Sequence, residues 1–408
     1  MAEVDFDVVV FGATGFTGRL VAEYLAQGYG TEGRPLRWAM AGRSQDKLER
    51  VRGELGVPSV PLIVADSGDR ASLEAMAGRT KVVCTTVGPY ALYGSELVDV
   101  CATTGTDYCD LTGEVPWMRE MIDAHQATAE QTGARIVHAC GFDCIPADLG
   151  VLFLQDAMMA ARGVYATHVK YRVVRMRGGT SGGTAASAIH LLEQVAREPR
   201  IRELVADPYA LDPPGSPRGN DVDDARCALY DPDFEQWTLP FVMAPVDTRV
   251  VRRSHALMGH RYGADFRFDE ALFTRMGGVG ARLAGWGMAA TLASLTLGPV
   301  RALAKLLLPS PGEGPSREAR ERGSFEALLY GVHPQDRALD LVARVTGDRD
   351  PGYGSTAKML GEAAVCLATD ALPTPGGVWT PATAMGAPLV QRLQERAGLT
   401  FSLVGDRP

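Results

Sequence analysis

Seven residues near the start of the chain, from Gly12 to Gly18, have the spacing of a loop that binds phosphate groups. Their three glycines follow the pattern G-x-x-G-x-x-G, directly after a short apolar run and before helix-like spacing. Gly12 permits a sharp turn, Gly15 lets a diphosphate approach the backbone, and Gly18 allows a helix to lie close to a strand. The first N–H groups of that helix would face the phosphates. A structural glycine turn is the alternative. The residues predicted to bind a dinucleotide are Gly12, Ala13, Thr14, Gly15, Phe16, Thr17 and Gly18.

Arg43 and Ser44 follow the second candidate strand, where a dinucleotide-binding domain distinguishes its cofactors. An acidic residue at this point favours the free ribose hydroxyl, whereas a cation favours a 2′-phosphate. Arg43 offers a guanidinium and Ser44 a further donor, so NADPH is the expected cofactor. A solvated arginine at a helix start is the alternative for Arg43. Asp66, which ends the third candidate strand, is expected near the adenine or as the cap of the next helix.

The segment Thr85–Tyr90 ends the fourth candidate strand. In parallel sheets the ligand crevice lies beyond the carboxyl ends of the strands. We therefore expect Val87, Gly88 and Pro89 beside the ribose and the nicotinamide. Tyr90 is expected to direct its hydroxyl toward the reacting atoms, and a buried tyrosine bonded to the backbone is the alternative.

Polar residues also follow the fifth and sixth candidate strands. Glu114 and Asp143 are candidate carboxylates of the site, whereas Asp148 is expected to cap a helix. Cys140 and Cys144 have no histidine or aspartate in metal register, so no metal site is predicted. The sequence contains neither a G-x-S-x-G elbow nor an H-E-x-x-H motif, which disfavours the common serine and zinc hydrolases.

Candidate strands alternate with candidate helices as far as Pro146. This alternation predicts right-handed crossovers and a parallel, doubly wound sheet. The candidate strands are 6–11, 36–41, 61–65, 81–87, 107–109 and 135–139. The candidate helices are 19–26, 44–54, 69–76, 95–103 and 117–131.

The alternation stops after Pro146. Residues 207–235 are rich in Pro, Asp and Gly and are expected to form a mobile surface loop. The basic segment 249–253 is interpreted as a solvated strand edge or as a docking surface for an acidic or phosphate-bearing partner. Further candidate elements are helices at 148–161, 185–197, 355–371 and 388–396, strands at 168–176, 241–243 and 264–268, a turn at 373–377, and a turn with a charged helix at 309–322.

The stretch Leu283–Val300 contains no charged residue and is bounded by Arg282 and Arg301. It is rich in Gly, Ala, Ser and Thr and is barely long enough to span a bilayer. A packed helix in a lipid-handling region is the leading interpretation, followed by peripheral membrane contact and a transmembrane helix.

The overall composition sets further limits. The chain has 408 residues with 46% hydrophobic and 22% charged residues and a net charge of -8, so it is globular and lacks the basic footprint of a nucleic-acid binder. Its 7 cysteines are scattered, which fits a reducing cytoplasm. The acidic N-terminus is unlike a signal peptide, so a cytoplasmic location is expected.

Nine segments of the sequence together resemble the saccharopine dehydrogenase-like oxidoreductases. Many enzymes share the glycine loop, whereas the ordered set is specific to this family. Within it, the sequence is most similar to the trans-acting enoyl reductases of mycobacteria, which assist polyketide synthases that make lipids. The segments are 12–18, 41–44, 85–90, 107–114, 141–150, 178–184, 244–254, 350–362 and 376–386.

The resemblance implies a fold with three parts. Residues 1–147 are expected to form an NADP-binding Rossmann domain, and residues 148–354 a second α/β domain with a mainly antiparallel sheet. Within this second domain lie the loop 207–235 and the apolar stretch 283–308. Residues 355–408 are expected to return to the Rossmann domain as helices.

The resemblance also implies NADPH-dependent reduction of the double bond of a carrier-bound polyketide or fatty-acyl thioester. That reaction needs a donor at the thioester oxygen and a proton for the α-carbon. Tyr90 is the first candidate and Lys358 the second, although Lys358 could be a surface cation. The stretch 283–308 could cover an acyl chain, and the segment 249–253 could contact a polyketide synthase carrier domain. A saccharopine-type amino-acid dehydrogenase and a catalytically silent NADPH-binding scaffold at a membrane are the alternatives.

Overall fold

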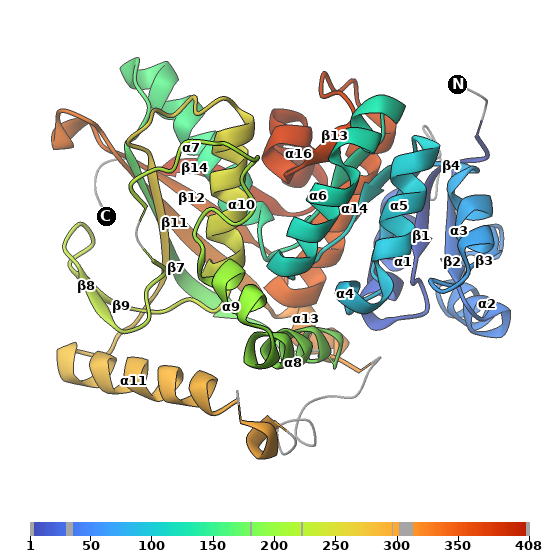
Figure 1. Cartoon of the computed structure of the whole chain (residues 1–408), viewed down its shortest axis with the longest axis horizontal. Helices are drawn as coiled ribbons and strands as arrows, with labels where there is room; N and C mark the ends of the chain where they lie inside the picture. The colour runs from blue at the N-terminus through green and yellow to red at the C-terminus, as the bar shows by residue number, and fades with distance from the viewer. Residues whose placement is uncertain are drawn as a thin grey trace.

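The computed structural model of the protein describes residues 4–29, 36–179, 182–221, 223–295, 297–301 and 313–404. Its body consists of two seven-stranded sheets, named A and B, with helices against their faces. Figure 1 shows the strands of sheet A at one end of the molecule and those of sheet B toward the other.

Sheet A is a parallel, doubly wound sheet. Its strands are β1 (Phe6–Phe11), β2 (Trp38–Gly42), β3 (Leu62–Val64), β4 (Thr80–Thr85), β5 (Asp107–Cys109), β6 (Arg135–Val137) and β13 (Gly377–Trp379). Their order is β13-β6-β5-β4-β1-β2-β3, and all neighbours are parallel. Every residue of β1 is buried, as expected for an apolar strand that is covered on both faces. The predicted Rossmann sheet is confirmed.

Helices cover both faces of sheet A. They are α1 (Phe16–Tyr29), α2 (Gln45–Glu54), α3 (Arg70–Ala77), α4 (Tyr90–Tyr93), α5 (Ser95–Thr104) and α6 (Val115–Thr132). The five predicted helices are confirmed, whereas the short helix α4 was not predicted. The seventh strand is an addition, since the sequence analysis predicted a turn at 373–377 and no strand after it. β13 joins the edge beside β6, with Val378 opposite Ile136.

Sheet B is mixed. Its strands are β7 (His168–Arg177), β8 (Leu229–Asp231), β9 (Gln236–Leu239), β10 (Arg267–Phe273), β11 (Ser324–Val332), β12 (Leu341–Gly347) and β14 (Leu399–Val404). In the order β14-β12-β11-β7-β10-β9-β8, the neighbours β7 and β10 are parallel and the other described pairs are antiparallel. The expected mainly antiparallel sheet is therefore confirmed. The residues did not predict β8, β9, β11, β12 or β14 individually, and the strand predicted at 241–243 is wrong, because these residues lie in a turn before a helix.

The remaining helices cover sheet B or join the two sheets. They are α7 (Ile145–Arg162), α8 (Gly182–Arg197), α9 (Pro199–Ala206), α10 (Ala244–Leu257), α11 (Gly278–Ser294), α13 (Arg317–Glu321), α14 (Thr356–Thr369), α15 (Pro381–Ala384) and α16 (Gly386–Arg396), with short turns of helix at Arg337–Leu339 and Pro351–Ser355. α14 packs on α1, where the buried carboxylate of Glu362 accepts hydrogen bonds of 2.6 Å from the hydroxyls of Tyr24 and Tyr29.

The basic segment 249–253 lies inside α10, so its interpretation as a solvated strand edge or docking surface is wrong. Arg249, Arg252 and Arg253 are each only 3% exposed. Arg252 donates to the carbonyl of Pro208 at 3.1 Å and pairs with Asp221 at 3.1 Å. A buried guanidinium is tolerated here because carbonyls and a carboxylate accept from its two Nη groups, while its Nε is only ion-paired with Asp221.

The same arginines hold the segment that was expected to be a mobile loop. Arg249 donates to the carbonyls of Val205 at 3.1 Å and Asp207 at 3.3 Å. Arg253 donates to the carbonyl of Leu211 at 2.6 Å. The segment makes turns of its own, such as the 3.0 Å bond from the N–H of Asp212 to the carbonyl of Tyr209, and the arginines of α10 bind further carbonyls in and next to it. From residue 229 the segment forms β8, which pairs with β9 just beyond its end in a β8–β9 hairpin.

The apolar stretch that begins at Leu283 lies in α11 and the residues that follow it. Residues 302–308 of the predicted segment 283–308 are outside the described part of the chain. Within the described ranges, no helix combines the length and apolar character that crossing a bilayer requires. Figure 1 shows α11 below the β8–β9 hairpin, at the periphery of the molecule.

Candidate active site

The glycine loop joins β1 to α1 and forms the centre of the candidate site. Gly12 has a φ of +89°, which favours glycine, and a Cβ there would lie 2.8 Å from Thr86 Oγ1. A Cβ on Gly18 would lie 2.1 Å from the carbonyl oxygen of Gly12. Gly15, at the tip of the loop, is exposed. Only glycine at positions 12 and 18 allows the backbone to form this cradle. The cradle fits the approach of a diphosphate.

Arg43 and Thr14 lie at one corner of this cradle. Gly42, which precedes Arg43, is so close to the loop that a Cβ on it would be 3.7 Å from Thr14 Oγ1. Arg43 is exposed and has no hydrogen bond or ion pair within the described part of the chain. Ser44 caps α2 by accepting a 3.3 Å hydrogen bond from the N–H of Lys47. The corner therefore presents a cation without a partner, as a 2′-phosphate would require.

Asp66 forms a turn at the end of β3. Its Oδ1 accepts a 2.9 Å hydrogen bond from the N–H of Gly68, while Asp69 caps α3. The helix cap that was considered for Asp66 is thus supplied by Asp69. Contact between Asp66 and an adenine stays a prediction.

The loop after β4 contributes accessible backbone and a buried tyrosine. Val87 and Pro89 are half-buried and Gly88 is exposed. The hydroxyl of Tyr90 donates to the carbonyl of Thr85 at 3.2 Å and accepts from the N–H of Leu111 at 3.4 Å, and its side chain is buried. This geometry matches the alternative of a buried tyrosine bonded to the backbone, because the hydroxyl points into the protein.

Lys358 lies beside α1 and α13. Its Nζ pairs with the two carboxylate oxygens of Asp348 at 2.8 and 3.1 Å. The shallow pocket around it is lined by residues such as Leu20, Glu23 and Arg317. The structure therefore does not bring Lys358 together with Tyr90, and the ion pair matches the alternative of a surface cation.

Asp110 fixes the loops that follow β5 and β6. Its Oδ1 accepts hydrogen bonds from the N–H groups of Thr112 at 3.0 Å and Ala139 at 2.9 Å. Its Oδ2 accepts from the hydroxyl of Tyr108 at 2.8 Å and lies 2.7 Å from His138 Nδ1. Ala139 has a φ of 62°, an uncommon value for a residue other than glycine. These bonds hold the two polar loops next to each other.

Glu114 is a structural carboxylate in this arrangement. It is buried and accepts 2.9 Å hydrogen bonds from the N–H groups of Tyr90 and Ala91 and from the hydroxyl of Ser187 on α8. Because the two carboxylate oxygens of Glu114 already accept three hydrogen bonds, this side chain is poorly placed to transfer a proton to a substrate.

Asp143 is the carboxyl group without a partner at the same edge. It is half-buried and makes no hydrogen bond or ion pair with any described residue. Its Oδ2 lies next to Gly113, where a Cβ would be 3.6 Å away. Burial raises the pKa of Asp143 to about 6. A carboxyl group with these properties can exchange a proton near neutral pH.

Two deeper carboxyl groups lie behind Asp143, and the sequence analysis did not identify them. Asp247 of α10 and Glu270 of β10 are buried, and Asp247 Oδ1 lies 3.4 Å from Cys144 Sγ. Burial, with the neighbouring carboxyl groups, raises the pKa of Asp247, and burial raises that of Glu270 to about 8. No local motif marks these residues, because separate elements of the second half of the chain bring them together.

The fold and the loop define an NADP-binding oxidoreductase. Residues 8–137 match the family described as the saccharopine dehydrogenase NADP binding domain. The structure also resembles that of saccharopine dehydrogenase (L-Glu forming) from Saccharomyces cerevisiae, with a TM-score of 0.51 and 12% identity over 98% of this chain and 99% of that one. The predicted fold, family and cofactor class are confirmed.

Relatives define the group within that class. A Mycobacterium tuberculosis protein named as a trans-acting enoyl reductase is 41% identical, in an alignment that covers 95% of this chain and 95% of that one. The trans-acting enoyl reductases of Mycobacterium bovis and Mycobacterium ulcerans are 39% and 38% identical over 96% and 97% of each chain. The chain belongs to the trans-acting enoyl reductase family.

Proposed function

We propose that this protein uses NADPH to reduce the carbon–carbon double bond of an acyl thioester held by a polyketide synthase. Family membership supports the reaction class, since the relatives carry this activity in their names. The observation that carries the proposal is the edge of sheet A, where Arg43 and Asp143 lack partners among the described residues. The first suits a phosphate and the second suits proton transfer.

The residues of the loop fit the cofactor. Gly12, Gly15 and Gly18 would admit the diphosphate to the backbone, and Arg43 would bind the 2′-phosphate. When bound, NADPH supplies the hydride that reduces the β-carbon of an α,β-unsaturated thioester.

We assign the proton for the α-carbon to Asp143. Tyr90 and Glu114 are bonded to other groups, and Lys358 is paired with Asp348. In the step we propose, the O–H bond of Asp143 breaks as a C–H bond forms at the α-carbon, and water later returns a proton to the carboxylate. Burial raises the pKa of Asp143 to about 6, which favours the acid form that the step needs.

The first experiment measures NADPH consumption with a soluble enoyl thioester, with saccharopine and NADP as the competing reaction. We expect the thioester to be reduced and saccharopine to be inert. Turnover of saccharopine alone would instead support an amino-acid dehydrogenase.

The variant Asp143→Asn tests the proton donor. We expect kcat to fall by about 100-fold or more, with NADPH affinity retained. Because the acid form is active, kcat/KM of the wild type should fall as the pH rises above about 6, and the variant should lose this limb. Asp156→Asn, an exposed carboxylate on α7, is the matched control. An unchanged kcat in Asp143→Asn would assign the proton to another group.

A carrier domain stays a proposed partner. Docking through Arg249, Arg252 and Arg253 is excluded because these side chains are buried. A carrier domain must therefore dock elsewhere. Peripheral contact with a membrane is a separate proposal and involves α11.

A further inference from the structure

Helix α11 presents its large apolar side chains to solvent. Val279, Leu283 and Trp286 are 76%, 70% and 74% exposed, and their spacing of four and three residues places them on one face. Leu297, beyond the end of the helix, is 58% exposed. Neighbouring apolar side chains with this exposure mark an interaction surface more often than a packing defect.

The opposite face of α11, which packs on the β8–β9 hairpin, carries small residues. A Cβ on Gly285 would lie 2.7 Å from the backbone N of Ala228, and a Cβ on Gly278 would lie 2.9 Å from the ring of Trp237. Ala281, between these glycines, is fully buried. Further along the helix, Met288 is half-buried and packs on the same cluster. The close contacts at Gly278 and Gly285 keep this face of α11 against the hairpin, which leaves Leu283 and Trp286 exposed.

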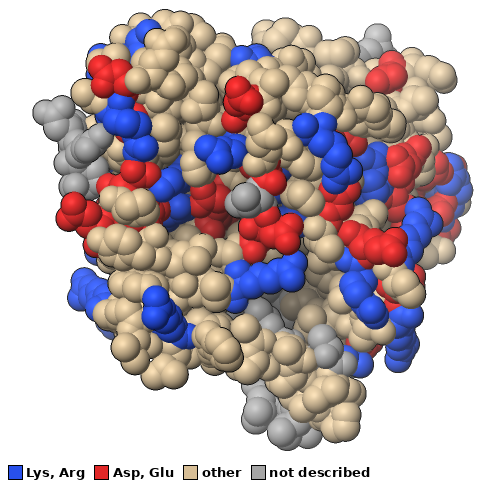
Figure 2. Space-filling model, turned by 60° about the vertical axis from the view of Figure 1, so that its left-hand side comes forward, with Lys and Arg blue, Asp and Glu red and all other residues tan. Residues whose placement is uncertain are grey.

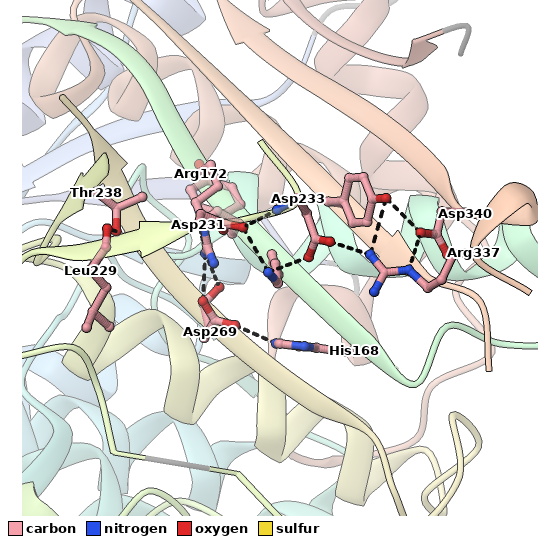
Figure 3. Close-up of polar contacts among 12 residues, drawn as sticks. His168, Arg172, Leu229, Asp231, Asp233, Thr238, Asp269, Arg337 and Asp340 are labelled. Atoms are coloured by element: carbon pink, nitrogen blue, oxygen red, sulfur yellow. Dashed lines mark hydrogen bonds and ion pairs between the residues drawn. The ribbon is translucent and has the colours of Figure 1, made fainter. Parts of the chain in front are cut away.

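The hairpin that α11 contacts forms one edge of sheet B, and charged side chains hold it there. Figure 3 shows Asp231 and Asp233 of the hairpin region among cations of neighbouring elements. Asp231 pairs with Lys170 at 2.9 Å and with Arg172 at 2.7 Å, and Arg172 pairs with Asp269 at 2.7 Å. These charges are largely buried, so the network holds the hairpin in one position. α11 therefore packs on a hairpin that is fixed in place, and the apolar face of the helix points to solvent.

The charged residues in this stretch of the sequence all have one sign. From residue 271 to residue 312 the sequence contains Arg275, Arg282, Arg301 and Lys305 and no Asp or Glu. Arg275 and Arg282 are exposed, and the guanidinium of Arg282 lies over the ring of Trp237. In Figure 2 the lower left of the molecule is mostly uncharged surface with a few Lys or Arg side chains, whereas charges of both signs mix above it.

We infer that α11 lies flat in the surface of an anionic lipid bilayer, with Val279, Leu283 and Trp286 among the acyl chains and Arg275 and Arg282 at the headgroups. An apolar helix face that carries a tryptophan and is flanked only by cations suits this environment. The rim of an interface with a soluble protein usually carries polar groups of both signs, whereas the exposed charged residues described in this stretch, Arg275 and Arg282, are both cations. The surface is separate from the nucleotide loop, so lipid binding does not depend on the proposed reaction.

The experiment is flotation of the full-length protein with vesicles of phosphatidylcholine, alone or mixed with phosphatidylglycerol. We expect the protein to float with the mixed vesicles and the association to weaken with salt. Leu283→Glu should lower the fraction bound by about tenfold or more, since it places a charge among acyl chains. Leu403→Glu is the matched control, because Leu403 is 46% exposed on β14 at the opposite edge of sheet B.

NADPH binding by each variant checks its folding. Brominated lipids should quench the fluorescence of the wild type, and Trp286→Phe should lose most of that quenching. A wild type that stays free of anionic vesicles, or equal binding by Leu283→Glu, would overturn the inference. A dimer that Leu283→Glu converts to a monomer would assign the face to a second copy and would also overturn it. Failure of the reductase assay would leave all these outcomes unaffected.

Discussion

The polar side chains at the edge of sheet A and those on the outer face of sheet B differ in whether they have partners. At the edge of sheet A, Arg43 and Asp143 have none among the described residues. On sheet B, Lys170, Arg172 and Asp231 are joined in one network. Groups without partners at an accessible edge are available to a ligand, whereas paired and buried groups stabilise one arrangement of the chain.

α10 shows that residue type alone does not separate the two cases. Arg252 and Arg43 are both arginines next to other polar residues in the sequence. Arg252 is buried and bonded to two backbone carbonyls and Asp221, while Arg43 is exposed. One holds a loop in place, and the other is proposed to bind a phosphate. Substitutions at the two positions should therefore change different properties.

The largest effect is expected on stability from Arg252→Met. The variant leaves Asp221 buried without its cation, which should lower the free energy of unfolding by about 3 to 5 kcal/mol. The affinity of the folded fraction for NADPH should stay within about twofold, because Arg252 bonds to Pro208, Phe268 and Asp221 and not to the glycine loop. Urea unfolding and NADPH fluorescence titration measure the two properties.

The double variant Arg252→Met with Asp221→Asn is the internal control. Removing the stranded charge should recover part of the lost stability, so the two substitutions should not be additive. Equal stability of Arg252→Met and the wild type would show that the buried ion pair of Arg252 with Asp221 does not hold the 207–235 segment in place.

An intermediate effect is expected at Asp148, which is buried with neutral donors but without a cation. It accepts hydrogen bonds from the hydroxyl of Ser254 and from the N–H of Ala382. Burial raises its pKa to about 7, from an ordinary value of 3.8. The folded state therefore favours the protonated acid, and its contribution to stability is complete below pH 3.8 and is lost as the pH rises through about 7.

Asp148→Asn cannot ionise and should escape that loss. The free energy of unfolding of the variant minus that of the wild type should rise with pH, by roughly 2 to 4 kcal/mol between about pH 4 and pH 8. Urea unfolding of both proteins across this range measures the difference. A constant difference would mean that Asp148 is charged in the folded protein throughout.

The comparison also explains which parts of the molecule the sequence could predict. The glycine loop and Arg43 depend on local chemistry, because a strand, a turn and a helix start within a few residues define them. β11 was missed because Leu328 and Leu329 are both buried, so its two faces are covered and the alternation of apolar residues is lost. The burial of Arg253 depends on Leu211 and Val378, whose carbonyls come from distant parts of the chain.

The candidate catalytic residues Tyr90 and Lys358 stay predictions, and the structure shows why their bonding could not be read from the sequence. Tyr90 was placed near the correct edge, but the direction of its hydroxyl is set by Thr85 and Leu111 inside the fold. Position along a strand predicts which edge a residue occupies. It does not predict whether a neighbour already satisfies the side chain, and that decides its availability for chemistry.

The smallest effect, and the sharpest test of the comparison, is expected from Arg43→Ala. An exposed arginine without a partner contributes little to stability, so urea unfolding should be unchanged within about 0.5 kcal/mol. NADPH affinity should fall by about 10-fold or more, while NADH affinity should change by less than about twofold, because only NADPH carries the 2′-phosphate. Arg50→Ala is the matched control, since Arg50 is another exposed arginine of α2 without a described partner. Equal losses for both nucleotides would mean that Arg43 does not contact the phosphate, and that a charge without partners at this edge is not sufficient to identify a ligand site.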